Sequence, residues 1–562
     1  MRRLCLVLLA AAAVVAAILN LTAATVLTSK DLDANTCHRP VAGSKVTPPP
    51  DLYSLYGVLN VRLEYHTSID DTGRTLFCFK TPRGAESPTL HVKPGDTLNI
   101  TLTNMVPALP AGAPSRAMSV ESNLACGSPT MTQTSVNMHF HGTNTRPVCH
   151  SDEVIHTLVN SSQIFRYSVT FPRDEPPGLY WYHPHVHGIA EAAVQGGATG
   201  LIVVEGIENL QPAVARLPQR FLVVRDQLVE APLNAQVTPP SWDLTLNYVP
   251  ISYPQLIPAV IEVLPGRKEF WRVANTSADT IVDLQLTYNE VVQPVEVVAL
   301  DGVATGSQDG KRRGILVTKT DILLPPAARA EFIVTTPPAS VSSAVFKSLA
   351  IDTGPLGDTD TARTLAVVKT VGSNSPSGSV AAALPTMPEP SAAPGRQRFE
   401  GISTAPIAAK RTLYFSEFNF LPSSRRNKAV QPESEATSEF YITVVGQGLE
   451  LFSPSNPPAI VTTQGSVEEW TIENQTEEVH EFHMHQIHFQ LREINHVPVA
   501  AEDRQFLDTV QVPYWTGHGP FPSITIAMDF RGDIIGDFVY HCHILGHEDN
   551  GMMAINCVLP RK

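Results

Sequence analysis

The chain has 562 residues, of which 43% are hydrophobic and 17% charged, an ordinary globular composition. Its formal net charge is -14 and no Lys/Arg-rich block stands out, which argues against a nucleic acid partner. The length exceeds what one hydrophobic core supports and suggests about three or four domains. The 47 prolines and 34 glycines are spread between Val/Ile/Leu/Thr-rich runs, a pattern that predicts an all-β fold of many short strands.

The N-terminus has the pattern of an export signal. Met1-Arg2-Arg3 is followed by an apolar stretch from Leu4 to Leu19 and then by small residues. We therefore expect residues 1–24 to be a cleaved signal peptide and the protein to be periplasmic or extracellular. The apolar stretch is nearly long enough to span a membrane, so an uncleaved anchor is the alternative. The two arginines also fit a twin-arginine export signal.

Seven cysteines are present, of which Cys5 lies in the expected signal and Cys542 belongs to a motif described below. The other five are Cys37, Cys78, Cys126, Cys149 and Cys557. An oxidising compartment would allow one or two disulfides among them, with at least one cysteine left over. The spacing does not fix the pairing.

A short pattern recurs three times along the chain. In each copy a glycine turn leads into a strand of alternating residues that ends at an asparagine. The turn glycines are Gly95, Gly266 and Gly465. They are about 170 and 200 residues apart, which suits three sandwich-like β domains of similar size.

The repeat gives the expected domain boundaries. We expect the domains over residues 50–207, 215–372 and 408–562. Residues 373–400 are rich in Ser, Pro and Ala and lack strand alternation, so we expect an exposed linker there.

Histidines gather in four tight clusters in the first and third expected domains. The clusters contain His139 and His141; His183 and His185; His480, His483 and His485; and His541, His543 and His547. Residues i and i+2 of a strand point to the same face, so each His-x-His pair presents two imidazoles side by side. Imidazole is a good ligand for copper and other late first-row metals. One such pair is weak evidence, but four pairs predict a metal site built from eight imidazoles.

Cys542 lies between two histidines of the last cluster and must face the opposite side of the same strand. A Cys thiolate, two histidines and a Met form the ligand set of a blue-copper electron-transfer site. His480, His547 and Met552 complete that set. One strand would then carry a mononuclear copper site on one side and part of the eight-imidazole metal site on the other. An electron arriving at Cys542 could leave through either neighbouring histidine.

The domains differ in what they keep of this pattern. Residues 178–185 parallel residues 536–543, with Pro184 in place of the cysteine, so the first domain has no thiolate site. In the middle domain the positions of the third cluster are apolar, and the domain is therefore a spacer or shapes access. These apolar positions are Ile281, Leu284 and Leu286.

The four clusters and the segment Asp508-Thr509-Val510-Gln511-Val512-Pro513 resemble the copper motifs of the multicopper oxidases, the family of laccases, cuprous oxidases, ferroxidases and bilirubin oxidases. The resemblance runs from about Val61 to Met553, and its most specific part is His541-Cys542-His543-Ile544 with His547, Gly551 and Met552. It implies three consecutive cupredoxin-like Greek-key β-sandwich domains and four copper ions. It also implies transfer of single electrons to dioxygen, with four electrons and four protons giving two waters.

Carried over position by position, the resemblance implies a ligand set for each copper. The type 1 copper, which accepts substrate electrons, would be held by His480, Cys542, His547 and axial Met552. The type 2 copper would be held by His139 and His483. One type 3 copper would be held by His141, His183 and His543, and the other by His185, His485 and His541. Dioxygen would bind among the last three coppers, between the first and third domains.

Two acids occupy positions where the family carries carboxylates near the copper cluster. The resemblance implies that Glu548 passes protons to the cluster, and Asp152 is either a second proton source or an ordinary loop acid. Two positions depart from the family, which usually has Pro where this chain has Glu481 and often Gly where it has Gln486. Glu481 could take a proton from a phenol or attract a cation, but we expect it to face solvent.

Other histidines are not expected to bind copper. His187 and His488 extend two clusters and are expected to support ligands or lie on the surface. His150 and His156 are expected to bind nothing. An axial Met, rather than Leu or Phe, suggests a type 1 potential toward the low end.

The sequence leaves the electron donor open. Laccase-like oxidation of phenols and aromatic amines is the first choice, and oxidation of Cu(I), Fe(II) or Mn(II) is the alternative. A copper nitrite reductase would have two domains and no type 3 pair, so the four His-x-His pairs argue against it. A copper-binding protein with little turnover would carry Met- or His-rich tracts, but the chain has only 10 Met and no Met-rich segment. The expected partners are O2 and a small reductant, with a membrane only if the N-terminal segment stays uncleaved.

Overall fold

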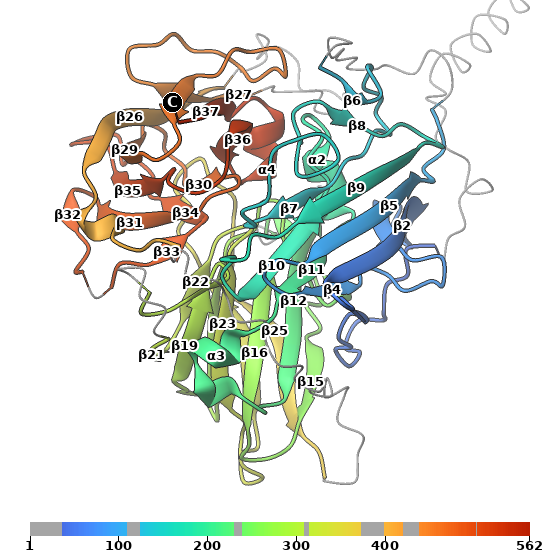
Figure 1. The fold of residues 1–562 in the computed structure, drawn as a ribbon. Coiled ribbons are helices and arrows are strands. Elements are labelled where there is room, and N and C mark those ends of the chain that lie inside the picture. Colours follow the sequence, from blue (N-terminus) through green and yellow to red (C-terminus); the bar gives the residue numbers. More distant parts are fainter. Residues whose placement is uncertain are drawn as a thin grey trace, which may run out of the picture.

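The computed structural model describes residues 36–109, 124–229, 239–307, 314–372, 398–419, 438–501 and 503–561. The expected signal peptide and residues 373–397 of the expected linker lie outside this part of the chain. The described residues form three two-layer bodies of β-strands with a few short helices, so the all-β prediction is confirmed (Figure 1). Among these residues, no helix is long and apolar enough to cross a membrane.

The first body, called the first sandwich below, contains a sheet of order β1-β4-β11-β10-β7 and a sheet of order β3-β2-β5-β9. A small pair, β6 and β8, and helix α2 complete it. The bounds are β1 Asp51–Tyr53, β2 Val58–Ile69, β3 Thr75–Lys80, β4 Thr89–Val92, β5 Thr97–Asn104, β6 Cys126–Gly127, β7 His139–His141, β8 Thr157–Leu158, β9 Ile164–Thr170, β10 Gly178–His183, α2 Ala190–Gln195 and β11 Gly200–Val204.

The middle sandwich follows the short helices α3 and η1. Its sheets have the orders β14-β13-β12-β16-β23-β19-β20, with β21 on β19, and β15-β25-β24-β17-β18, with β22 on β17. The bounds are α3 Ile207–Leu210, η1 Pro212–Val214, β12 Gln219–Leu228, β13 Trp242–Leu246, β14 Val249–Ile251, β15 Ala259–Val263, β16 Lys268–Asn275, β17 Val282–Tyr288, β18 Val291–Val292, β19 Val295–Leu300, β20 Val303–Ala304, β21 Val317–Lys319, β22 Ile322–Leu324, β23 Arg329–Thr335, β24 Ala344–Leu349 and β25 Arg363–Thr370.

The third sandwich contains a sheet of order β27-β26-β29-β35-β31-β32, with β33 on β31, and a sheet of order β28-β37-β36-β30-β34. The bounds are η2 Ile402–Thr404, β26 Ile407–Asn419, β27 Ser438–Val444, β28 Ile460–Thr463, β29 Val467–Asn474, β30 His480–Met484, β31 Phe489–Ile494, β32 Val497–Pro498, β33 Phe506–Leu507, β34 Thr509–Val512, β35 Ser523–Asp529, β36 Gly536–Cys542, α4 Leu545–Asp549 and β37 Met553–Leu559. We propose that the three sandwiches are the three domains expected from the repeat.

The repeated strands occupy the same place in all three sandwiches. They are β5, β16 and β29, and each runs parallel to one neighbour and antiparallel to the other. The asparagine that ends each strand is buried, and its side-chain amide donates to two backbone carbonyls. Asn474, for example, donates to the carbonyls of Glu478 and Val512, which flank the start of β30. The repeated asparagine therefore fixes the loop that leads into the third histidine cluster.

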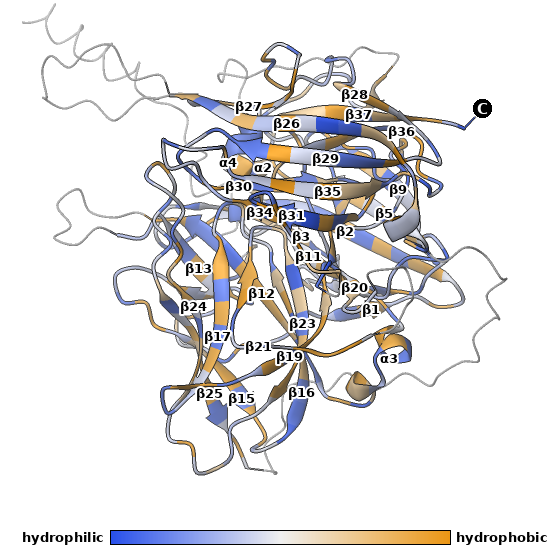
Figure 2. Ribbon diagram, turned by 90° about the vertical axis from the view of Figure 1, so that its left-hand side faces the viewer, coloured by the Kyte–Doolittle hydropathy of each residue, from blue (hydrophilic) through white to orange (hydrophobic). Residues whose placement is uncertain are grey.

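Each sandwich has its own apolar core, and smaller apolar clusters join them. Alternation produces the cores, as β17 shows with apolar and polar residues in turn (Figure 2). The three apolar positions noted in the middle domain are buried there, at Ile281, Leu284 and Leu286. The cluster that joins the first and middle sandwiches contains Leu179 and Trp181 of β10 with Phe221 of β12.

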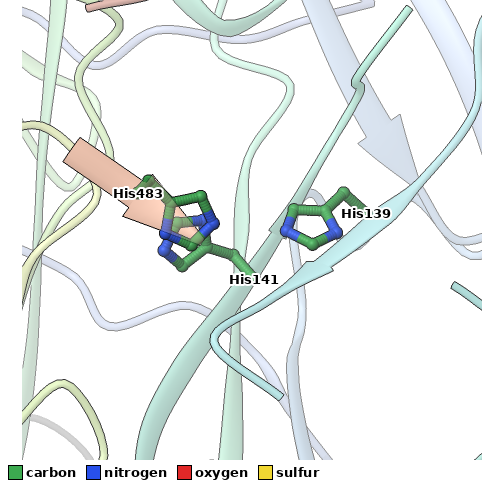
Figure 3. A group of neighbouring side chains, drawn as sticks. All are labelled: His139, His141 and His483. Atoms are coloured by element: carbon green, nitrogen blue, oxygen red, sulfur yellow. The ribbon is translucent and has the colours of Figure 1, made fainter. Parts of the chain in front are cut away.

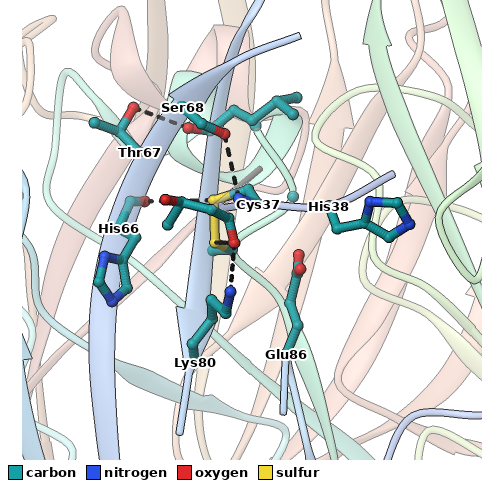
Figure 4. The surroundings of a disulfide bond; sticks show 12 residues. Cys37, His38, His66, Thr67, Ser68, Lys80 and Glu86 are labelled. Carbon is teal, nitrogen blue, oxygen red and sulfur yellow. Dashed lines mark hydrogen bonds between the residues drawn. A yellow bond between two sulfur atoms is a disulfide. The ribbon is translucent and has the colours of Figure 1, made fainter. Parts of the chain in front are cut away.

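Two disulfides tie down the first domain. Cys37 is bonded to Cys78 and Cys126 to Cys149, whereas Cys557 is free, so the expected one or two bridges with a cysteine left over are confirmed. Figure 4 shows the Cys37–Cys78 bond, which holds the segment before β1 against β2 and β3.

Candidate metal centre

Two pairs of strands that carry predicted ligands, β7 with β10 and β30 with β36, lie on either side of the boundary between the first and third sandwiches (Figure 1). In the first sandwich β7 pairs with β10, which sets His139 opposite His183. In the third sandwich β30 pairs with β36, which sets His483 opposite His541. Because side chains alternate along a strand, the histidines of both pairs point into one shared space.

The structure gathers eleven of the twelve predicted ligands into four groups. In each group the nitrogen or sulfur atoms all lie within 4.8 Å of one another. The groups are His139, His141 and His483; His141, His183 and His543; His185, His485 and His541; and His480, Cys542 and His547. Figure 3 shows the first group, in which the rings of His141 and His483 stack with centroids 4.0 Å apart.

Hydrogen-bond contacts fix one ring nitrogen of several histidines and leave the other nitrogen of the same ring available. The Nδ1 atoms of His183, His483 and His541 contact the backbone carbonyls of Pro184, Asp508 and Cys542 at 2.7–2.9 Å. His139 Nδ1 contacts Asp152 Oδ1 at 2.9 Å. These bonds fix each ring's orientation, which is what the outer partners of metal-bound histidines do.

The remaining nitrogens are buried without hydrogen-bond partners among the described residues. They include Nε2 of His139, His183 and His483, Nδ1 of His141, and both ring nitrogens of His543. The Nε2 atoms of His185 and His485 instead converge on His541 Nε2, at 3.3 and 3.1 Å. Orphaned buried polar atoms cost free energy, and a cation among the rings would satisfy them. The site residues therefore fit bound metal ions.

Burial also sets the ionisation that metal binding requires. Burial, reinforced by neighbouring imidazoles, holds the pKa values of six histidines well below the ordinary range, namely His141, His183, His185, His483, His485 and His543. Burial alone lowers the pKa of His547 to about 3. Neutral imidazole is the metal-binding form.

The fourth group has the composition of a blue-copper site. Cys542 Sγ lies 3.6 Å from His480 Nδ1 and 3.7 Å from His547 Nδ1, and these two nitrogens are 3.0 Å apart. Met552 is buried beside them, and its backbone bonds to both Cys542 and His547. Burial raises the pKa of the Cys542 thiol well above its usual range, so a thiolate here needs a cation beside it.

The two predicted acids lie next to cluster histidines but in different settings. Glu548 is buried, with Oε2 3.2 Å from His541 Nδ1 and Oε1 3.6 Å from His185 Nδ1. Asp152 is fully engaged, since Oδ1 contacts His139 Nδ1 and accepts from the Phe140 amide. Its Oδ2 accepts from the side chains of Thr145 and Gln486, at 3.1 and 2.9 Å.

The two departures from the family pattern have structural explanations. Gln486 adopts a positive φ of 59°, a conformation that glycine adopts readily, and its amide holds Asp152. The expectation that Glu481 faces solvent is wrong, because its side chain is completely buried. On β30 it shares a face with His483, and Gln511 of β34 donates to its Oε1 at 3.2 Å.

The sequence did not predict the partners of several residues around the ligands, and it left His488 as either a support for ligands or a surface residue. Asp508 contacts His141 and is paired with Arg329 from the middle sandwich, and His488 is buried with Nε2 2.9 Å from the carbonyl of Asp301. Asp508 lies in the segment 508–513 that resembles the family, but no pattern there indicates that its carboxylate pairs with Arg329. Glu478 lies beside the copper-ligand candidate His547, with Oε1 3.4 Å from Nε2.

The chain is similar to multicopper oxidases by three comparisons. Residues 129–208 and 423–561 match two family models, each described as multicopper oxidase. The multicopper oxidase LPR1 homolog 3 of Oryza sativa subsp. japonica is 22% identical over 476 residues, covering 71% of this chain and 80% of that protein. LPR1 homolog 5 of the same plant is 23% identical over 459 residues, covering 71% of this chain and 63% of that protein.

Solved structures share the fold. A multicopper oxidase from Campylobacter jejuni, described as a metallo-oxidase, has a TM-score of 0.64 at 20% identity, covering 94% of this chain and 97% of that one. A laccase-like multicopper oxidase, CueO, from Ochrobactrum sp. has a TM-score of 0.61 at 18% identity, covering 92% and 100%. The two segments that match multicopper oxidase models together contain all four histidine clusters, so the parts of the chain that carry the candidate ligands are multicopper oxidase domains.

Proposed function

We propose that the protein oxidises a donor one electron at a time and reduces dioxygen to water with four copper ions. One would be type 1, held by His480, Cys542, His547 and Met552; one type 2 and two type 3 would be held by the eight other histidines. Copper, when bound, supplies the one-electron redox chemistry and the reduction of dioxygen. One observation carries the proposal, namely that Cys542 belongs to one group while its neighbours along the chain, His541 and His543, belong to two others.

The protein's part in electron transfer is to provide a short covalent route. An electron leaving Cys542 Sγ crosses one side chain and one peptide unit to reach either flanking histidine. The Glu481 amide donates to Cys542 Sγ at 3.3 Å, and Cys542 is completely buried. This bond fixes the sulfur, and burial keeps water away from it.

Proton supply is the second task of the surrounding residues. Burial raises the pKa of Glu548 well above its usual range, which favours the protonated carboxyl beside His541 and His185. We propose that Glu548 delivers protons to the dioxygen site. Asp152 accepts from three donors and also contacts His139, an arrangement that supports positioning of that ring.

The edge of the type 1 group favours a cationic donor. His547 is the partly exposed member, with 13% of its side chain accessible, and Phe440 stacks on it. Glu478 lies against its Nε2 atom, and burial, a hydrogen bond shared with Glu417 and the charge of Asp358 raise the pKa of Glu478 to about 10. The two glutamates therefore share one proton, which a bound metal cation would displace. Carboxylate oxygens bind metal cations directly, whereas a phenol would use them only as proton acceptors. We therefore propose a reduced metal ion, such as Fe(II), Cu(I) or Mn(II), as the donor.

Oxygen uptake by the copper-loaded protein tests both parts of the proposal. The donors are Fe(II), Cu(I), Mn(II), a methoxyphenol and an aromatic amine. Glu478→Gln should raise the KM for the metal ion about tenfold, because it removes the oxygen that a cation would bind on displacing the proton shared with Glu417, and unit charges about 4 Å apart interact by roughly 1–4 kcal/mol between water and a protein surface. Glu296→Gln is the control, because it makes the same substitution at an exposed Lys268 pair in the middle sandwich.

The outcomes separate the candidate functions. Uptake confined to phenols and amines, unaffected by Glu478→Gln, would return the function to the laccase-like reaction. Absence of uptake with every donor despite full copper loading would contradict the oxidase and favour a copper-binding protein.

We also propose that the protein is exported to an oxidising compartment. The two disulfides of the first domain support this location, because such bonds persist where thiols are not kept reduced.

A further inference from the structure

We propose that the middle sandwich, which supplies none of the residues in the four groups, contributes a positioning residue to the three-copper site. That residue is Arg329 at the start of β23, which holds Asp508 against His141 and His483. The proposal rests on the copper assignment above and adds a function for a domain that the sequence indicated only as a spacer or a shaper of access.

Arg329 and Asp508 form a bidentate ion pair in the protein interior. Arg329 Nη1 donates to Asp508 Oδ1 at 2.7 Å and Nη2 donates to Oδ2 at 2.6 Å. Both side chains are completely inaccessible to solvent. A guanidinium that meets both oxygens fixes the plane of the carboxylate as well as its position, which a single contact would not do.

Asp508 in turn fixes two candidate copper ligands from different domains. Its Oδ1 lies 3.1 Å from His141 Nε2, and its backbone carbonyl lies 2.7 Å from His483 Nδ1. These contacts leave His141 Nδ1 and His483 Nε2 as the nitrogens without partners among the described residues. Both histidines belong to the group shared with His139. The carboxylate of Asp508 therefore orients the ring of His141, and its backbone carbonyl orients the ring of His483.

The position of Arg329 is itself set by all three domains. Its Nε donates to the carbonyl of Leu179 on β10, the strand that ends at His183. Asp301 accepts from the Arg329 backbone amide with Oδ1 and from the Asp508 amide with Oδ2, at 2.9 and 3.2 Å. Burial alone would lower the pKa of Arg329, but Asp508 and Asp301 raise it above the usual value, so the guanidinium stays charged.

Gly142, directly after His141, leaves the space for this pair. Its φ is +81°, and a Cβ there would lie 2.5 Å from Asp508 Oδ2 and closer still to Arg329 Nη2. The glycine of the first histidine motif thus permits the pair to approach the backbone of a ligand strand, a role independent of the hydrogen bonds above.

The test compares two buried arginine pairs of the same sandwich. Arg329→Met removes the guanidinium beside Asp508. Arg272→Met is the matched control, because Arg272 Nε contacts Glu331 Oε2 at 2.5 Å with both side chains about 1% exposed, and this pair contacts none of the four groups. Copper per chain, the type 2 EPR signal and the blue type 1 absorption are measured after copper loading and again after dialysis against a chelator.

The expected result is a selective loss. Arg329→Met should keep the blue absorption and retain the coppers assigned to His141 and His483, one type 3 ion and the type 2 ion, roughly 10- to 100-fold more weakly against the chelator, the range typical for outer partners of metal ligands. Arg272→Met should give the wild-type spectra despite a lower Tm. Arg329→Lys should recover part of the type 2 signal. If Arg329→Met does not fold, Arg329→Met with Asp508→Asn, which removes both charges, is measured with the same expectation.

Two results would overturn the proposal. One is an unchanged type 2 signal in Arg329→Met, and the other is a parallel loss of type 1 and type 2 signals that Arg272→Met reproduces. A wild-type protein that binds type 1 copper but never gives a type 2 signal would instead refute the copper assignment itself.

Discussion

Gly142→Ala is the substitution whose cost can be worked out most directly from the structure. A residue other than glycine at this φ costs about 1–2 kcal/mol. The added methyl group would overlap Arg329 Nη2 and Asp508 Oδ2, and overpacking of a filled interior costs typically about 1–3 kcal/mol. We therefore expect a loss of about 2–5 kcal/mol in stability. The displaced Asp508 should also weaken the type 2 copper signal.

Gly188→Ala separates the two contributions. Gly188 has nearly the same φ, +83°, in the same domain, but nothing lies within 4 Å of the added Cβ. It should show only the conformational cost of about 1–2 kcal/mol. Calorimetry of the copper-free proteins, followed by copper loading and EPR, measures both effects. Equal losses of stability in the two variants, with equal type 2 signals, would refute the argument that the ion pair fills the space behind His141.

Three further predictions concern the copper sites and the pH dependence. Cys542→Ser should abolish the blue absorption and leave the type 2 EPR signal, and retention of the blue colour would contradict the type 1 assignment. Glu548→Gln cannot release a proton, so oxygen reduction should fall by about 10²–10⁴ while anaerobic reduction of type 1 copper in stopped flow keeps its wild-type rate. Burial raises the pKa of Glu175 to about 7, against bonds from Asn144 and the charge of Arg398. Because the folded value exceeds the unfolded one, the contribution of Glu175 to stability is complete below about pH 4.5 and is lost as the pH rises to about 7, a change of at most about 3 kcal/mol. Glu175→Gln should therefore reduce the fall in Tm between pH 5 and pH 8, and an unchanged fall would show that other groups cause it.

The copper ligands could be predicted because their geometry is local. The i, i+2 rule places His541 and His543 on one face of β36 and Cys542 on the other, without reference to the rest of the fold. The repeat predicted the strands that precede the clusters for a similar reason, because its turn glycine and terminal asparagine make their contacts within a single sandwich. Applied to β30, the same rule puts Glu481 on the face of His483, so its burial could have been anticipated.

The surroundings of the ligands depend on contacts between distant segments. Arg329 reaches Asp508 from another domain, and no periodicity or motif in the sequence connects the two residues. The role of Gln486 also became clear only in the structure, where its amide meets Asp152. Such contacts are set by how the three sandwiches pack together, which sequence patterns within one strand do not encode.

The ratio of electrons removed from the donor to dioxygen consumed tests the central claim most directly. The copper-loaded protein is given a limiting amount of oxygen and an excess of whichever one-electron donor supports uptake, and hydrogen peroxide is assayed at the end. Four groups of ligands joined through Cys542 and its neighbours predict four electrons per O2 and no accumulated peroxide. A ratio of two electrons per O2 with a matching yield of peroxide would contradict a cooperating three-copper site.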